Sequence, residues 1–266
     1  MKSYKKRFPF KIGTTSYILP VKEESVVSNV SFLKDSFDMV QLLFFGREYL
    51  EEVMSRRIIL DLGAIRNNTG LSYTVHLPSD LELLSASERS LGSSIDVIER
   101  ICTETAPLGI EGYVLHVDRL ERGIPSVGLD AEHAELFQRA IDAITDRLGP
   151  DAAANIYIEN TTYDLVYFSR TILRNPCRVC CDAGHLLLHH HDLRRFVEIY
   201  GGKIAQAHLH GVDAGRDHQA LTGADEIFAG GVARFLRKFS GSVIIEVYNL
   251  HDLVKSMEYI ERIMEI

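Results

Sequence analysis

The feature that most constrains the fold is a strict alternation of short apolar runs with longer amphipathic stretches. The runs resemble buried strands, whereas hydrophobic residues between them recur at helical spacing. Such alternation produces parallel strands joined by helical crossovers. We predict strands at residues 11–17, 39–45, 71–77, 112–117, 155–159, 178–182, 204–208 and 242–247, and helices at 21–37, 48–65, 85–105, 130–148, 162–173, 192–200, 224–239 and 252–263.

Eight strand–helix units in a chain of 266 residues are typical of a closed α/β barrel of the (β/α)8, or TIM, type. The alternative is an open, doubly wound sheet, which more usually has a glycine-rich first turn. Gly13-Thr14-Thr15 is not such a turn. No linker, low-complexity tract or change of composition separates the halves of the chain. We therefore expect residues 1–266 to form one barrel domain.

Composition narrows the class of function. A formal charge of −8 argues against general affinity for nucleic acid, which requires a basic face. Four cysteines are too few for a disulfide scaffold, and we interpret them as buried strand thiols. The basic start of the chain lacks the apolar core of a signal peptide, and no run is long enough for a membrane span. We expect a cytoplasmic protein, and the sequence does not specify its oligomeric state.

Side chains that bind metals stand at the ends of six consecutive predicted strands, the third to the eighth. One histidine at a strand end is usually an ordinary rim residue. In a barrel, however, the carboxyl ends of all strands meet at one rim, where buried acids and imidazoles are costly unless a cation holds them. We therefore predict a divalent metal centre built from His76, His116, Glu159, Asp182, His208 and Glu246.

Two further histidines extend this set. His185 follows Asp182 by three residues, across a glycine, and His218 lies in the loop after the seventh strand. His208 and His210 share a strand face, whereas residues 189–191 are interpreted as a solvated run of histidines at a helix start. Histidines combined with carboxylates suit zinc first, with manganese and ferrous iron as alternatives. Because the candidates exceed one coordination shell, we expect between one and three ions.

At these residues the whole chain resembles the xylose-isomerase-like barrels, a superfamily of sugar isomerases, sugar epimerases and endonuclease IV. The resemblance implies that Glu159, Asp182, His208 and Glu246 hold a metal. The endonuclease IV branch adds histidines that match His76, His116, His185 and His218. Two positions depart from that pattern: Arg216 stands where the branch has an Asp, with Asp217 adjacent to His218, and Gln41 stands where relatives often have a Glu.

Five sequence blocks resemble, more narrowly, the cobamide-remodelling hydrolase family. Those enzymes cleave the phosphoribosyl bond in the nucleotide loop of cobamides and release cobinamide phosphate and the lower-ligand riboside. The resemblance implies a corrinoid substrate, and we predict Glu159, His218 and Glu246 as catalytic residues, with His218 as a proton donor. The blocks are Lys11-Ile-Gly-Thr-Thr-Ser-Tyr-Ile18, Tyr73-Thr-Val-His-Leu-Pro78, Cys181-Asp-Ala-Gly-His-Leu-Leu-Leu188, His208-Leu-His-Gly-Val212 and Asp217-His218.

Three alternatives remain open. A sugar isomerase or epimerase could use Glu159 and Glu246 to move a proton on a metal-bound hydroxyketone, but it would not need so many histidines. An abasic-site endonuclease is disfavoured by the acidic charge. A non-catalytic corrinoid carrier would not need the carboxylates of the fifth to eighth strands.

Overall fold

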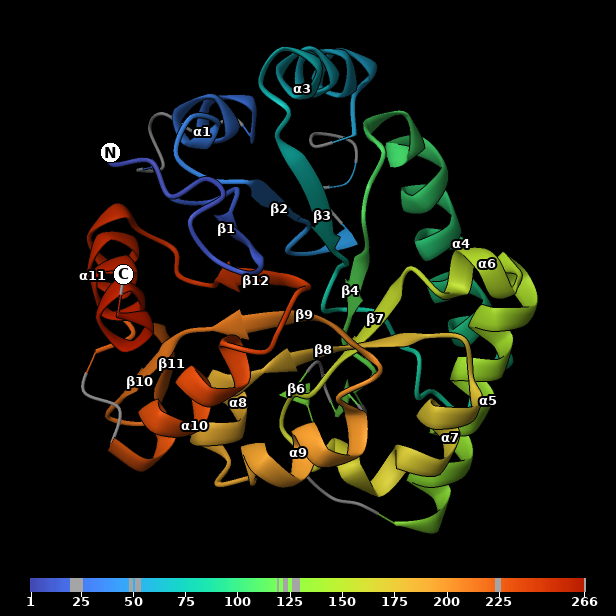
Figure 1. Ribbon diagram of the computed structural model, residues 1–266. Helices are drawn as coiled ribbons and strands as arrows, with labels where there is room; N and C mark the ends of the chain where they lie inside the picture. Colours follow the sequence, from blue (N-terminus) through green and yellow to red (C-terminus); the bar gives the residue numbers. More distant parts are fainter. Residues whose placement is uncertain are drawn as a thin grey trace.

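The eight predicted strands form a closed parallel barrel surrounded by helices (Figure 1). The computed structural model describes residues 1–19, 26–47, 50, 54–118, 120–121, 124–125, 130–222 and 226–265. The first strand pairs with both the second and the last, which closes the sheet and excludes the doubly wound alternative. In barrel order the strands are β1 (Lys11–Thr15), β12 (Ser242–Ile245), β9 (Ile204–Leu209), β8 (Arg178–Asp182), β7 (Ile156–Glu159), β4 (Tyr113–Leu115), β3 (Ser72–His76) and β2 (Met39–Leu43).

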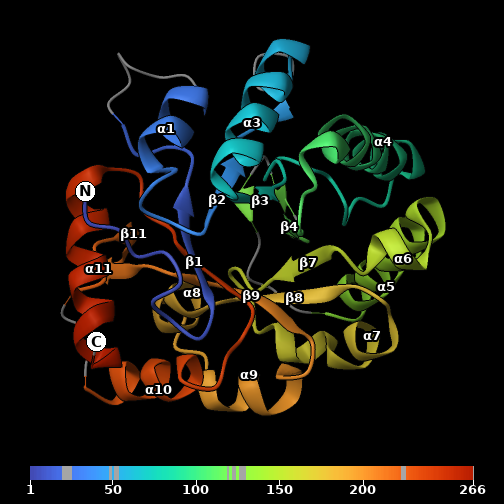
Figure 2. The same ribbon diagram turned by 45° about the horizontal axis from the view of Figure 1, so that its top comes forward.

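The helices pack outside the barrel, as Figure 2 shows from a second direction. The main ones are α1 (Val26–Leu33), α3 (Arg56–Thr69), α4 (Glu88–Thr105), α5 (Ala131–Leu148), α7 (Ser169–Arg174), α9 (Leu193–Tyr200), α10 (Glu226–Leu236) and α11 (Leu250–Met264). The starts of the predicted helices 21–37, 48–65 and 224–239 lie outside the described residues. The helix predicted at 48–65 is not continuous, because residues 54 and 55 are not helical and α3 begins at Arg56. Within the described ranges, no helix combines the length and the apolarity that crossing a membrane requires.

Several predicted boundaries were wrong for local reasons. The helix predicted from residue 85 begins at Glu88, because the Ser87 hydroxyl accepts a hydrogen bond from the backbone N–H of Ser90 and caps it. The helix predicted to end at 65 continues to Thr69, where Gly70 with φ of 69° terminates it. The helix predicted at 162–173 is a 3-10 turn, η4 (Leu165–Phe168), followed by the short α7.

Short elements that the sequence analysis missed lie mainly in the loops after strands. They are the hairpin β5 (Leu120–Glu121) and β6 (Ile124–Pro125), the hairpin β10 (Gly211–Asp213) and β11 (Arg216–Gln219), α8 (Ala183–Leu188), α6 (Pro150–Ala153) and η3 (Ala106–Leu108). Of these, α8 and the β10–β11 hairpin follow β8 and β9, and they carry candidate site residues.

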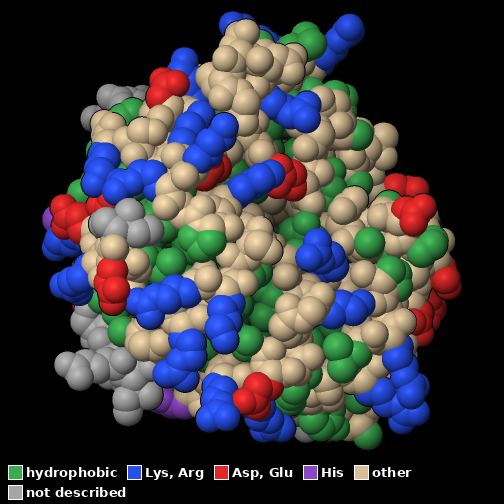
Figure 3. Space-filling view, viewed as in Figure 1, with side chains coloured by type: hydrophobic (Ala, Val, Ile, Leu, Met, Phe, Trp, Pro, Cys, Tyr) green, Lys and Arg blue, Asp and Glu red, His purple; other side chains and the backbone are tan. Residues whose placement is uncertain are grey.

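The strands are buried on both faces, as expected for a parallel barrel covered by helices; every residue of β2 and of β9 is buried. Cys177, Cys180 and Cys181 are buried free thiols and Cys102 is half-buried, which fits their interpretation as core residues. In the view of Figure 3, lysine and arginine side chains outnumber acidic ones although the net charge is −8. Charge is therefore distributed unevenly over the surface.

Candidate metal centre

The four residues predicted at the ends of strands five to eight meet at one point. Asp182 and His208 are register partners on β8 and β9, so their side chains leave neighbouring strands side by side. His208 Nδ1 lies 2.9 Å from Glu159 Oε1, 2.7 Å from Glu246 Oε2 and 3.8 Å from Asp182 Oδ2. Three carboxylates and one imidazole, all buried, thus share one small volume.

A second group adjoins the first through Glu159. His76 Nε2 and His116 Nε2 lie 3.3 and 3.1 Å from Glu159 Oε2, while the other oxygen of the same carboxylate faces His208. Both histidines come from the ends of β3 and β4, as predicted. Glu159 is therefore placed to bridge two cation sites.

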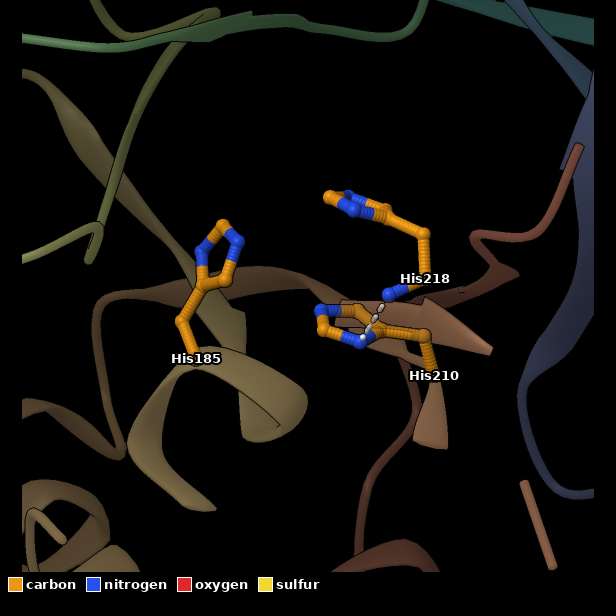
Figure 4. A group of neighbouring side chains, drawn as sticks. All are labelled: His185, His210 and His218. Atoms are coloured by element: carbon orange, nitrogen blue, oxygen red, sulfur yellow. Dashed lines mark hydrogen bonds between the residues drawn. The ribbon is translucent and has the colours of Figure 1, made fainter. Parts of the chain in front are cut away.

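A third group contains His185, His210 and His218 (Figure 4). The rings of His210 and His218 stack with centroids 4.4 Å apart, and the ring of His185 is nearly perpendicular to both. Asp217 lies between two of these histidines: its carboxylate is 3.8 Å from His185 Nε2 and 3.1 Å from His218 Nδ1. The acid adjacent to His218 thus reaches this group, whereas Arg216 is exposed and contacts Asp213.

His210 is a site residue that our predicted ligand set did not contain. Its Nδ1 accepts a hydrogen bond from the backbone N–H of His218, and its Nε2 lies 3.1 Å from Asp182 Oδ1. A Cβ at Gly184 would lie only 2.2 Å from His210 Cε1, so the ring fits only because residue 184 is glycine. His210 therefore connects α8, the β10–β11 hairpin and the Asp182 carboxylate. In the sequence the available signal was its alternation with His208, but β9 ends at Leu209, one residue before His210.

The donor set fits a divalent cation. In the described part of the chain, all ion-pair contacts of Glu159, Asp182 and Glu246 are with histidines. Asp182 Oδ2 is buried without a hydrogen-bond partner among the described residues, and Glu246 Oε2, although 2.7 Å from His208 Nδ1, receives no well-directed hydrogen bond from them. Buried carboxylate oxygens in that condition are costly, and coordination to a cation would compensate them.

Backbone carbonyl groups contact the Nδ1 atoms of two of the histidines, an arrangement that is common in histidines that bind metals through Nε2. His76 Nδ1 lies 2.8 Å from the carbonyl oxygen of Leu77, and His185 Nδ1 lies 3.1 Å from that of Asn160. A proton on Nδ1 that is donated to a carbonyl leaves the Nε2 lone pair for a cation. In His76, Nε2 is the atom that faces Glu159. In His185, Nε2 lies 3.8 Å from Asp217 Oδ2, and Nδ1 also lies 3.6 Å from Asp182 Oδ2.

His208 is held from its other side by two glutamines. The amide groups of Gln41 and Gln206 lie 3.0 and 2.9 Å from His208 Nε2, and Gln41 Oε1 has no partner among the described residues. Rotating the Gln41 amide would let Oε1 accept a hydrogen bond from the Nε2–H of His208 and leave Nδ1 with its lone pair towards the three carboxylates. The Gln at this position, a departure from relatives, is thus compatible with a ligating His208.

The carboxylates and imidazoles shift each other's pKa strongly. Burial alone would lower the pKa of His185 and His218, but the carboxylates of Asp182 and Asp217 raise that of His185 to about 10, and the carboxylates of Asp217 and Glu246 raise that of His218 to about 10. Burial opposes ionisation of Glu159 and Glu246, yet the charge of His208 holds the pKa of both well below the usual range. Without metal, protons on histidines therefore balance the carboxylates.

This balance predicts a pH effect on stability. A histidine pKa raised to about 10 in the folded state stabilises the metal-free fold fully below the ordinary value of about 6.5, and the contribution is lost as the pH rises through 10. We expect the melting temperature of chelator-treated protein to fall by several degrees between pH 6.5 and 10, and that of metal-loaded protein to fall less. Calorimetry at matched pH values checks this; a constant difference between the two forms would contradict it.

The groups open into a pocket of about 210 Å³ at the barrel rim. His76, His116, His185, His218 and Glu246 line one part of it. The structure therefore brings all eight predicted ligands together, adds His210 and Asp217, and places several of them against a space for a small ligand. Of the run 189–191, His189 and His191 are half-buried and His190 is exposed, and none of them lines this pocket.

Comparison with known proteins gives one family and many similar folds. The sequence model of a family described as "Xylose isomerase-like TIM barrel" matches residues 32–263. A D-tagatose 3-epimerase-like protein superposes with a TM-score of 0.76 at 22% identity, covering 96% of this chain and 97% of that one. The 3-keto-D-glucoside 4-epimerase of E. coli gives 0.68 at 15% identity, covering 97% and 100%.

Endonuclease IV from Thermus thermophilus is also similar, with a TM-score of 0.63 and 18% identity over 95% of this chain and 99% of that one. No curated protein matches the sequence. At these identities the solved structures establish the fold, and the chemistry has to be argued from the site itself.

Proposed function

This chain belongs to the xylose isomerase-like TIM barrel family, and within it we propose that the protein is a metal-dependent hydrolase that cleaves the phosphoribosyl bond in the nucleotide loop of cobamides. The observation that carries the proposal is Glu159, whose two oxygens face two separate groups of histidines. A shared carboxylate supports adjacent cations, an arrangement suited to phosphodiester cleavage. The proposed substrate comes from the sequence blocks that resemble the cobamide-remodelling family.

Some residues of the site would hold cations, and others would transfer protons during the reaction. Glu159, Asp182, His208 and Glu246 would hold one cation, His76 and His116 with Glu159 a second, and His185 with His218 and Asp217 a third. Zinc suits this mixture best. When bound, such cations would polarise a phosphoryl oxygen. They would also lower the pKa of a water so that it loses a proton and attacks phosphorus at neutral pH.

His218 is positioned to supply a proton to the leaving ribose oxygen. Its Nδ1 is 3.1 Å from Asp217, and its Nε2 lies 3.7 Å from Glu246 Oε2. In the metal-free site the carboxylates raise its pKa to about 10, so the imidazole carries a proton at pH 7 in molecules where His218 holds no cation. Attack of water on phosphorus then breaks the P–O bond to ribose, whose oxygen takes that proton, while Glu246 accepts the proton that the water loses.

A direct assay tests the proposal. Metal-loaded protein is incubated with a cobamide and, separately, with a panel of ketoses, and products are identified by mass spectrometry. We expect cobinamide phosphate and a riboside in the first incubation, suppressed by a chelator and restored by zinc. Absence of both products with every divalent metal tried, from protein of verified metal content, would refute the function.

A second candidate is a sugar epimerase on the same metal. Glu159 and Glu246 both contact Nδ1 of His208, at 2.9 and 2.7 Å, so two carboxylates lie close enough together to deprotonate and reprotonate one carbon. Conversion of a ketose to its epimer in the same panel would favour this candidate. The histidines of the third group have no role in that reaction.

A further inference from the structure

The pocket at the rim combines two kinds of wall. One part is made of the imidazoles and the carboxylate described above, and the rest is mainly apolar, made of Leu43, Phe44, Phe45 and Tyr248 together with Ser79. A ligand that fills this pocket must therefore have a polar end for the metal groups and an apolar end beside them.

Three aromatic side chains form a corner on the apolar side, which we call the aromatic corner: Tyr17, Phe45 and Tyr248. They follow β1, β2 and β12, which are neighbours in the barrel, so the corner occupies one continuous part of the rim. The ring centroids lie 4.9, 6.1 and 6.3 Å apart, and the rings are steeply inclined to one another. In such edge-to-face packing, rings support one another and keep their orientation.

The aromatic corner joins the metal centre through Tyr248. Its ring stacks on His218 with centroids 4.9 Å apart, and its hydroxyl donates to Glu246 Oε1 at 3.4 Å. His210, His218 and Tyr248 thus form a continuous stack from Asp182 to the rim. The position of the corner relative to the metal ligands is therefore fixed by direct contacts.

Phe45 is the exposed member of the corner. Its side chain is 46% exposed, whereas the preceding Phe44 is 2% exposed and belongs to the core. One exposed phenylalanine on a surface means little. Here, however, the exposed ring lines a pocket whose other side holds clustered metal-type ligands, and this combination points to a ligand.

We propose that the aromatic corner binds the flat heteroaromatic base of a riboside whose phosphodiester lies at the metal centre. This inference rests on the proposed function and deepens it, because it places the lower-ligand base in the site. Stacking on an aromatic ring accepts any planar base, and the bound base covers the exposed Phe45 ring. The riboside released by hydrolysis keeps this base and should itself bind.

The test measures binding of two probes to the metal-loaded full chain by calorimetry: benzimidazole riboside, which has a flat base, and ribose, which lacks one. Phe45→Ala removes the ring, and Phe45→Leu keeps an apolar side chain without an aromatic face. Phe32→Ala is the matched control, because Phe32 on α1 is 39% exposed and does not line the pocket.

We expect the wild type and Phe32→Ala to bind the riboside equally and more tightly than ribose. Phe45→Ala and Phe45→Leu should weaken riboside binding by roughly tenfold or more and leave ribose binding unchanged. Equal riboside affinity in all four proteins, or no preference for riboside over ribose in the wild type, would overturn the inference.

The same proteins in the cobamide assay separate this inference from the proposed function. Hydrolysis by the wild type with a KM that rises in Phe45→Ala supports both. Hydrolysis with a KM unaffected by Phe45→Ala removes the aromatic corner as the base site and leaves the hydrolase intact. Absence of hydrolysis in the wild type removes the proposed function, whatever the riboside does.

Discussion

Glu159→Gln is expected to lose metal from two sites at once and to lower turnover by about 10³-fold or more, since metal chemistry supplies several kcal/mol to such reactions. The two oxygens of Glu159 face His208 on one side and His76 and His116 on the other. An amide has nearly the same shape, but it carries no charge and offers one oxygen in place of two. The loss should therefore come from chemistry at the site and not from packing.

Metal content by mass spectrometry, with turnover and melting temperature, checks this prediction. Glu111→Gln is the control, because Glu111 pairs with Lys11 in a partly exposed ion pair, and exposed pairs contribute little. The control should keep its metal and its activity. A Glu159→Gln protein with unchanged metal content and turnover would be incompatible with a bridging carboxylate.

Gly184→Ala is expected to have the second largest effect. The added methyl group would lie 2.2 to 2.4 Å from three ring atoms of His210, closer than real Cβ contacts. His210 is fully buried and fixed at both nitrogens, so α8 or the ring has to move, and Asp182 moves with it. Overpacking of this kind costs about 1–3 kcal/mol of stability, and displacement of Asp182 should weaken metal binding as well.

Two comparisons make the Gly184 prediction specific. Gly92→Ala also replaces a helical glycine, but nothing lies within 4 Å of its Cβ position, so it should be neutral or stabilise the protein by up to ~1 kcal/mol. The double variant Gly184→Ala, His210→Ala removes the clash, and its stability should recover while its metal affinity does not. A fully stable single variant with normal metal content would show that His210 does not hold Asp182.

The barrel and most of the candidate ligands were predictable because both follow from periodicity. Strand alternation placed His208 on one face, and parallel strand ends meet at one rim whatever the intervening sequence, which brought Glu159 and Glu246 together. Neither step depends on the details of loops.

Residues beyond the strand ends were not predictable in this way. β9 ends at Leu209, so His210 lies in a connection where strand parity no longer fixes the direction of a side chain. The left-handed conformation of His218, with φ of 52°, and the β10–β11 hairpin bring Asp217 back to His185. These positions depend on tertiary contacts that no local pattern encodes.

Substrate choice follows a similar division. The carboxylates and histidines can serve a phosphodiester or a hydroxyketone alike, since both present oxygens to a cation. We therefore expect the choice between these substrates to depend on residues at the rim, such as the aromatic corner and Asp217, which lie outside the group formed by Glu159, Asp182, His208 and Glu246. The same fold accordingly hosts epimerases and endonuclease IV among the similar structures.

The most direct test of the central claim is anomalous diffraction from crystals of the purified protein, recorded on both sides of the zinc absorption edge and, in parallel, at the manganese and iron edges. We predict an anomalous peak enclosed by Glu159, Asp182, His208 and Glu246, and a second one between Glu159, His76 and His116. Well-ordered side chains in the positions described here, with no anomalous peak among them after soaking with each metal, would contradict the account.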